Sequence, residues 1–206
     1  MREFKLPYGK EKMVLKVEED HLGGVLVSKI HDYDPGKSGE ALVREAVEKP
    51  IGTPRLKDMA EGKKKIVVIS SDHTRPVPSH IIMPVILEEI RKGNPDAEIT
   101  ILVSTGLHRA TTKEELIGKY GEKICSREKI VVHDCDDGNN LVYIGKLPSG
   151  GKLIINRLVA EADLVVAEGF IEPHFFAGFS GGRKSILPGV ASRETVMYNH
   201  NSAFIA

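Results

Sequence analysis

The sequence predicts an α/β protein with a doubly wound, mostly parallel sheet, helices on both faces of that sheet and a β-rich N-terminal segment. Three observations support this prediction. Short apolar runs rich in β-branched residues recur along the chain, which is typical of strands buried on both faces. Segments with apolar residues at helical spacing separate those runs, and this alternation favours parallel strands. The first residues instead alternate between apolar and polar side chains, as the strands of a hairpin do.

The N-terminal segment is expected to form a hairpin and then a helix. Residues 4–17 contain two short runs around Tyr8-Gly9-Lys10, and residues 13–17 alternate between apolar and polar side chains, which indicates paired strands. Residues 38–48 carry apolar side chains at helical spacing, so we expect a helix there.

Buried strands and helices are expected to alternate in the rest of the chain. The strands are the apolar runs at residues 65–70, 98–104, 129–133 and 163–167. The helices cover residues 79–92, 112–120 and 193–200, and a hairpin covers residues 141–156. One helix has especially clear boundaries, because Thr112 and Glu115 match a capping box at its start and Gly121 follows its end.

The composition is that of an ordinary globular protein. The chain has 206 residues, enough for one sizeable domain, and we expect residues 1–206 to form one. Lys and Arg together number 29, as do Asp and Glu, whereas a nucleic-acid binder usually has a basic excess, so no nucleic-acid partner is expected. There is neither an apolar run of the roughly 18 residues that a membrane helix needs nor a signal peptide, so we expect a cytoplasmic protein without a membrane partner. The abrupt end at Ala206, just after an apparent helix, suggests a missing continuation.

Polar side chains follow the predicted strands. In open α/β sheets, ligands bind beyond the carboxyl ends of the strands. Asp72 and Arg75 come just after the run at 65–70. Arg75 could bind a substrate carboxylate as a planar fork that Asp72 holds in place. The alternatives are that Asp72 caps the following helix or that the two residues form a surface ion pair.

Two histidines at other strand ends are candidate acid/base groups. His108 and His174 each follow a predicted strand, and imidazole titrates near neutral pH. Phe175 and Phe176 could form a dry wall that lowers the pKa of His174 and keeps it a neutral base. The alternative for His108 is a loop histidine bonded to a backbone carbonyl.

A glycine-rich loop at residues 178–185 contains Lys184. The loop resembles a phosphate-binding loop, but the pattern G-x-x-x-x-G-K-[ST] requires glycine where Arg183 stands. Lys184 could be a point charge for phosphate or, in a poorly solvated pocket, an amine that forms a covalent bond. His200 could be a metal ligand or a helix-end histidine stabilised by the helix dipole. The residues alone therefore predict a polar crevice and leave the reaction open.

Several motifs at these positions are similar to those of the lactate racemase family. They are Ser71-Asp72-His73-Thr74-Arg75-Pro76, Ser104-Thr105-Gly106-Leu107-His108-Arg109, the run from Glu172 to Gly189, and Tyr198-Asn199-His200-Asn201. The resemblance extends over essentially the whole chain. Family members are longer and have a C-terminal domain that closes over the site and is absent from this chain, so residues 1–206 would be the N-terminal catalytic and cofactor-binding domain.

The resemblance implies a racemase that interconverts D- and L-lactate, or a related 2-hydroxy acid, by hydride transfer to a nickel pincer nucleotide. This cofactor is a pyridinium mononucleotide that grips nickel with two sulfur arms. Lys184 would carry it covalently and His200 would be a nickel ligand. The implied partners are the 2-hydroxy acid, the C-terminal domain and the enzymes that build the cofactor.

The resemblance also assigns the remaining candidate residues. His108 and His174 would be the acid/base pair, and Arg75, with Asp72 beside it, would orient the substrate. Two other functions are consistent with the sequence. One is a non-catalytic phosphate- or nucleotide-binding module that uses the loop at 178–185, and the other is an apo domain with a structural role only.

Overall fold

The computed structural model describes residues 1–174 and 177–205. It contains two units, residues 1–37 and residues 38–206, and each is described by itself.

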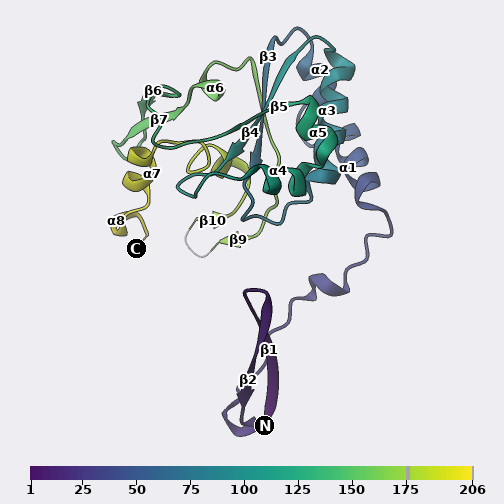
Figure 1. Cartoon of the computed structure of the whole chain (residues 1–206), viewed down its shortest axis with the longest axis vertical. Helices are drawn as coiled ribbons and strands as arrows, with labels where there is room; N and C mark the ends of the chain where they lie inside the picture. The colour runs from purple at the N-terminus through teal and green to yellow at the C-terminus, as the bar shows by residue number, and fades with distance from the viewer. Residues whose placement is uncertain (175–176, 206) are drawn as a thin grey trace. The chain divides into compact units, whose positions relative to one another are not determined.

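The first unit is the predicted hairpin followed by short 3-10 turns (Figure 1). Strands β1 (Arg2–Tyr8) and β2 (Glu11–Val17) pair antiparallel along their whole length. Gly9 has a φ of +60°, which suits the tight turn between them. The turns that follow are η1 (Glu19–His21) and η2 (Lys29–Asp32). The prediction of a β-rich N-terminal segment is confirmed.

A parallel sheet forms the centre of the second unit (Figure 1), with its strands in the order β5-β4-β3-β8. The strands are β3 (Lys65–Ser71), β4 (Glu98–Ser104), β5 (Lys129–Val132) and β8 (Leu164–Ala167). Every neighbouring pair is parallel. The two central strands are buried from their second residue to their sixth, as continuous apolar runs predict. The predicted fold class is therefore confirmed.

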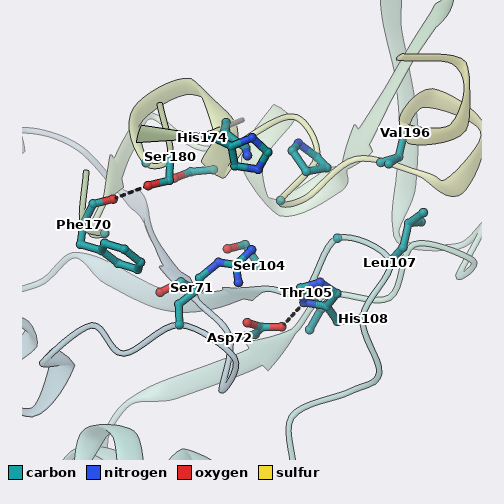
Figure 2. Close-up of a pocket in the computed structure, with 18 of the residues that line it drawn as sticks. Ser71, Asp72, Ser104, Thr105, Leu107, His108, Phe170, His174, Ser180 and Val196 are labelled. Carbon is teal, nitrogen blue, oxygen red and sulfur yellow. Dashed lines mark hydrogen bonds and ion pairs between the residues drawn. The ribbon is translucent and has the colours of Figure 1, made fainter. Parts of the chain in front are cut away.

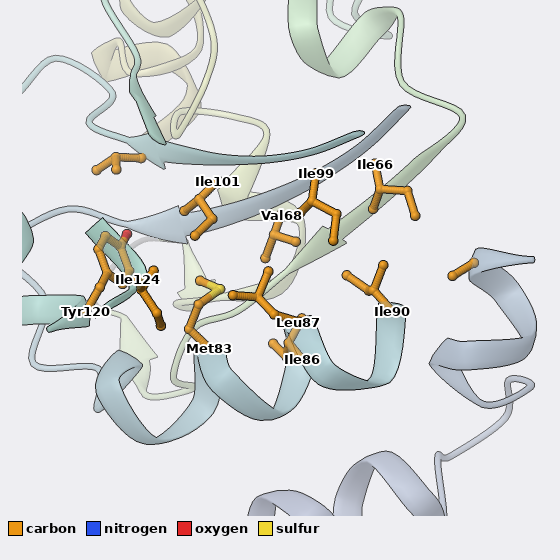
Figure 3. Close-up of a cluster of buried hydrophobic side chains, with 12 residues drawn as sticks. Ile66, Val68, Met83, Ile86, Leu87, Ile90, Ile99, Ile101, Tyr120 and Ile124 are labelled. Carbon is orange, nitrogen blue, oxygen red and sulfur yellow. The ribbon is translucent and has the colours of Figure 1, made fainter. Parts of the chain in front are cut away.

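Helices cover one face of this sheet. Met83, Leu87 and Ile90 project from one helix onto Val68 and Ile101 of the two central strands (Figure 3). The helices on this side of the unit are α1 (Gly39–Glu48), α2 (Leu56–Ala60), α3 (Ser79–Gly93), α4 (Lys113–Tyr120) and α5 (Glu122–Arg127). The capping box predicted for α4 is present, with Thr112 and Glu115 each accepting a hydrogen bond from the other's backbone N–H.

A hairpin and shorter helices cover the second face. Ile155, Val190 and Val196 pack here against Val67 and Leu102. The elements of this layer are β6 (Leu141–Lys146), β7 (Lys152–Asn156), α6 (Arg157–Ala160), η3 (Gly182–Ser185) and α7 (Arg193–Asn199). Layers on both faces agree with a doubly wound sheet.

The elements that the sequence did not predict are all short. They are α2, α5, α6, α8 (Ser202–Ile205), β9 (Pro173–His174), β10 (Gly178–Phe179) and the 3-10 helices η1, η2 and η3. Each is too short for a helical or strand period to stand out in the sequence.

The path of the chain creates a switch point between β3 and β8. The connections from β3 to β4 and from β4 to β5 run over the first face, through α3 and then α4 and α5. The connection from β5 to β8 returns over the second face, through the β6–β7 hairpin and α6. The loops after β3 and β8 therefore leave the sheet on opposite sides, which opens the crevice where doubly wound proteins bind ligands.

The core gives a first stability prediction. Ile101 is fully buried on β4, so Ile101→Ala should leave a cavity and lower the free energy of unfolding by about 2–5 kcal/mol. Urea denaturation of the chain measures this change. The control is Ile144→Ala on β6, whose side chain is half exposed and whose loss should cost less than about 1 kcal/mol. Equal losses for the two variants would contradict the position of the core.

Candidate functional site

All six candidate residues line one cavity at the carboxyl ends of β3, β4 and β8. The cavity has a volume of about 310 Å³, which suits a small ligand. The six residues are Asp72, Arg75, His108, His174, Lys184 and His200. Figure 2 shows Asp72 and His108 on one side of the cavity and His174 and Ser180 on the other.

Asp72 holds His108 at one side of the cavity. Its Oδ2 lies 2.6 Å from Nδ1 of His108, and Asp72 is only 2% exposed. Its Oδ1 accepts hydrogen bonds from the Thr74 backbone N–H at 3.1 Å and from the Thr74 hydroxyl at 2.6 Å. His108 reaches this position because Gly106, with a φ of +56°, turns the chain sharply after β4.

These contacts determine the charge of Asp72 and the tautomer of His108. Burial disfavours the carboxylate, but the hydrogen bonds from Thr74 and His108 outweigh it, and the pKa of Asp72 lies below its usual value. An ionised carboxylate can only accept a hydrogen bond, so His108 carries its proton on Nδ1 when neutral. Nε2 is then the nitrogen with a free lone pair, as a general base requires.

The contacts of Asp72 and His108 exclude the three alternatives for this side of the cavity. Asp72 does not cap the next helix, because α3 begins at Ser79, with Pro78 at its N-cap position and no side-chain cap. Asp72 also forms no ion pair with Arg75 among the described residues, because its carboxylate turns towards Thr74 and the loop after β4. The prediction that Asp72 holds the Arg75 fork in place is therefore wrong. His108, finally, bonds through its ring to a carboxylate rather than to a backbone carbonyl.

Lys184 lies in η3, half-buried beside the cavity. Burial lowers its pKa first, the positive charge of Arg75 lowers it further, and Glu172 opposes both effects. Within the part of the chain that the structure describes, the ammonium has no carboxylate partner. A lowered pKa increases the fraction of neutral amine, which is the form that acts as a nucleophile.

His174 and His200 lie on the other side of the same cavity. His174 is on β9, which pairs with β10, and His200 ends α7 with its N–H donated to the Val196 carbonyl. The pKa of His174 is lowered by loss of hydration, then by Lys184 and Arg75, with Glu172 opposing and His200 adding to the decrease. These effects favour the neutral form of the His174 imidazole. The predicted wall of Phe175 and Phe176 lies outside the described residues.

A buried polar network behind the cavity was not predicted. Glu168 follows β8 and is 5% exposed, and its Oε1 accepts hydrogen bonds from the hydroxyls of Ser70 and Ser79. Tyr120 donates to Ser70 at 2.7 Å. The Lys119 ammonium is buried close by, and burial lowers its pKa against the attraction of Glu168 and Asp72. The only sequence signal was the position of Glu168 directly after a run that was predicted to be a buried strand; in the structure β8 is only partly buried.

The chain matches a known protein family. A family model described as "Lactate racemase N-terminal domain" matches residues 8–206. The chain belongs to the lactate racemase family. The lactate racemase of Thermoanaerobacterium thermosaccharolyticum is 56% identical over 205 residues, which cover 100% of this chain and 48% of that protein. The lactate racemase of Lactiplantibacillus plantarum is 53% identical over 200 residues, 97% of this chain and 47% of that protein.

A solved member of the lactate racemase family has the same fold. The structure of the apoprotein from Thermoanaerobacterium thermosaccharolyticum matches with a TM-score of 0.87 and 55% identity, over 98% of this chain and 47% of that chain. The chain thus spans about half the length of the curated relatives it matches. No helix within the described residues is long and apolar enough to cross a membrane.

Lactate racemase membership does not favour a phosphate-loop module. The glycine-rich segment at 178–185 is divided between β10 and η3, and η3 has only four residues. A phosphate-binding loop instead leads directly into a longer helix whose N-terminus faces the anion.

The Asp72 carboxylate gives a pH-dependent prediction. Its pKa is depressed in the folded state, so its stabilising effect is present above the unfolded pKa of about 3.9 and is lost as the pH falls through the lower folded pKa. Asp72→Asn should cost on the order of 1–3 kcal/mol at pH 7 and less below about pH 4. Urea unfolding at both pH values measures it. The control is Asp96→Asn in an exposed turn, and a cost for Asp72→Asn that stays constant with pH would contradict the prediction.

Proposed function

We propose that this chain is the N-terminal, catalytic part of a lactate racemase that interconverts D- and L-lactate or a related 2-hydroxy acid. The observation that carries the proposal is the convergence of three histidines, one arginine and one lysine of lowered pKa on a single cavity of about 310 Å³. The curated relatives, both named lactate racemases, support the same reaction.

The two acid/base histidines suit a reaction that must work on both faces of one carbon atom. Racemisation breaks the bond between the α-carbon and hydrogen and remakes it on the opposite face. The hydroxyl proton must leave at the same time, and a neutral imidazole can accept it. His108 and His174 lie on opposite sides of the cavity, so each could serve one enantiomer (Figure 2).

Arg75 is the group that we assign to the substrate carboxylate. It lines the cavity beside His108 and His174, and within the described part of the chain no carboxylate pairs with its guanidinium. A planar guanidinium binds a carboxylate with two parallel hydrogen bonds and so fixes its orientation. In this proposal Asp72 acts on the substrate only through His108, whose Nδ1 it holds.

The residues present fit the nickel pincer nucleotide that the resemblance implies. Lys184 has the lowered pKa and the missing carboxylate partner that suit an amine used for covalent attachment. His200 lies at the same cavity, close enough to His174 to lower its pKa, and imidazole is a suitable nickel ligand. When bound, the cofactor would supply a hydride acceptor, so that no carbanion has to form at the α-carbon.

Intact mass spectrometry combined with nickel analysis tests this proposal. The chain, continued by the second half of the Thermoanaerobacterium thermosaccharolyticum lactate racemase, is co-expressed with the enzymes that build the cofactor. We expect an added mass of mononucleotide size on a peptide containing Lys184, accompanied by nickel, and turnover of a 2-hydroxy acid. Unmodified protein without nickel would overturn the proposal, and tight binding of a plain nucleotide would then favour the phosphate-binding module.

A further inference from the structure

The N-terminal hairpin has one apolar face and one polar face. The register pairs Phe4 with Leu15 and Leu6 with Met13, so these side chains lie on the same side of the hairpin. We call this side the apolar hairpin face. Its apolar members are Phe4, Leu6, Tyr8, Met13, Leu15 and Val17, and the charged Arg2 and Glu11 lie on the same side at its two ends. The opposite side carries Glu3, Lys5, Pro7, Lys12, Val14 and Lys16. Antiparallel strands have this alternation when one face packs on a core and the other faces water.

Most of the apolar hairpin face is left uncovered by the described residues of the first unit, although the Arg2 guanidinium lies over the Phe4 ring, 5.6 Å from its centroid. Leu6 is 48% exposed, Met13 54% and Tyr8 69%. None of the described side chains of residues 1–37 is buried. A two-stranded hairpin is at best marginally stable in water unless its apolar face packs on something else. The hairpin therefore has the pattern of a packed sheet without the partner that would stabilise it.

The segment after the hairpin also exposes apolar side chains. Leu26 is 103% exposed, Val27 73%, and Ile30 and Tyr33 are 69% and 71% exposed. Single exposed apolar side chains are normal, but a run of them in one short segment marks an interaction surface. Its extent indicates a large partner.

A second copy of this chain fits the apolar hairpin face poorly. Strands of this length span about 23 Å, and a hairpin is about 10 Å wide, so two such faces in contact would bury only about 460 Å². Separate chains that associate specifically bury about 1,200–2,000 Å². The face therefore needs a partner that contributes more surface or is held close by the same polypeptide.

The relatives contain such a partner. Their similarity to this chain includes the hairpin, since it covers 100% of the chain, yet it accounts for only 48% of the length of the first relative. We propose that the apolar hairpin face binds the folded segment that these relatives carry beyond the matched half. The hairpin then packs against that second half. This contact depends on neither nickel nor racemase activity.

Hydrogen exchange tests the proposal in the chain of residues 1–206 and in the fusion of this chain with the second half of the Thermoanaerobacterium thermosaccharolyticum lactate racemase. In the chain alone, the β1 and β2 amides should exchange nearly as fast as in an unfolded peptide. In the fusion, which is first shown to unfold cooperatively, the same amides should exchange at least about 100-fold more slowly, because docked strands exchange only when they open from their partner. Equal rates in the two proteins would overturn the proposal.

Neighbouring residues on opposite sides of the hairpin provide matched variants. Met13→Glu puts a charge on the apolar hairpin face and should return the fusion's hairpin amides to fast exchange, whereas Met13→Leu should not. Val14→Glu introduces the same charge on the polar side and should leave the slow exchange unchanged. Equal effects of the two glutamate variants would overturn the proposal. So would protection in residues 1–206 alone that increases with protein concentration, because that result would identify a second copy as the partner.

Discussion

Lys184→Ala is expected to abolish covalent attachment of the cofactor and, with it, all racemase activity. The amine is half-buried, its pKa is lowered by burial and by Arg75, and it lines the same cavity as His108 and His174. A methyl group cannot form the bond, so the effect should be complete rather than partial. Intact mass spectrometry of the co-expressed fusion protein measures it directly, as loss of the added mononucleotide mass.

Lys184→Arg separates the two chemical roles that the sequence left open. Arginine keeps a positive charge at this position but is not a nucleophile, since it stays protonated. If Lys184 is the point of attachment, the arginine variant should lack the added mononucleotide mass, as the alanine variant does. If it is only a charge for phosphate, the arginine variant should keep part of the bound nucleotide. Arg183→Ala is the adjacent control, because Arg183 is exposed and should leave attachment unchanged.

Local patterns in the sequence were enough to predict the strands and the longer helices. The runs at 65–70 and 98–104 are β-branched and apolar without interruption, and burial on both faces is the environment that such runs fit. Thr112 and Glu115 fix the start of α4 through contacts only three residues apart. Each of these features depends on neighbours in the chain, so the order of the strands does not affect it.

Contacts between distant residues could not be predicted in the same way. Asp72 and His108 are 36 residues apart, and they meet only because β3 and β4 are neighbours in the sheet. Glu168 and Ser79 meet because β8 lies beside β3 on its other side. The strand ends predicted which side chains gather at one edge of the sheet, but the partner of each side chain depends on strand order, which hydrophobic periodicity does not encode.

His108→Ala and His174→Ala are each expected to reduce racemisation by about 10²–10⁴-fold in the loaded fusion enzyme. Interconversion of the enantiomers requires a proton acceptor on one side of the cavity and a proton donor on the other, so loss of either histidine should slow the reaction from both D- and L-substrate. Chiral analysis of product from each enantiomer measures this. His80→Ala is the control, since His80 is exposed on α3 and outside the cavity.

His108 and His174 should differ in their dependence on Asp72. Asp72→Asn removes the carboxylate that holds Nδ1 of His108, and it changes no contact of His174. An asparagine side chain can donate to Nδ1, which would place the His108 proton on Nε2 and remove the free lone pair that faces the substrate. Asp72→Asn should therefore reproduce most of the His108→Ala defect while attachment at Lys184 stays intact. Wild-type rates in Asp72→Asn would show that the carboxylate does not control His108, and wild-type rates in either histidine variant would remove that residue from the acid/base pair.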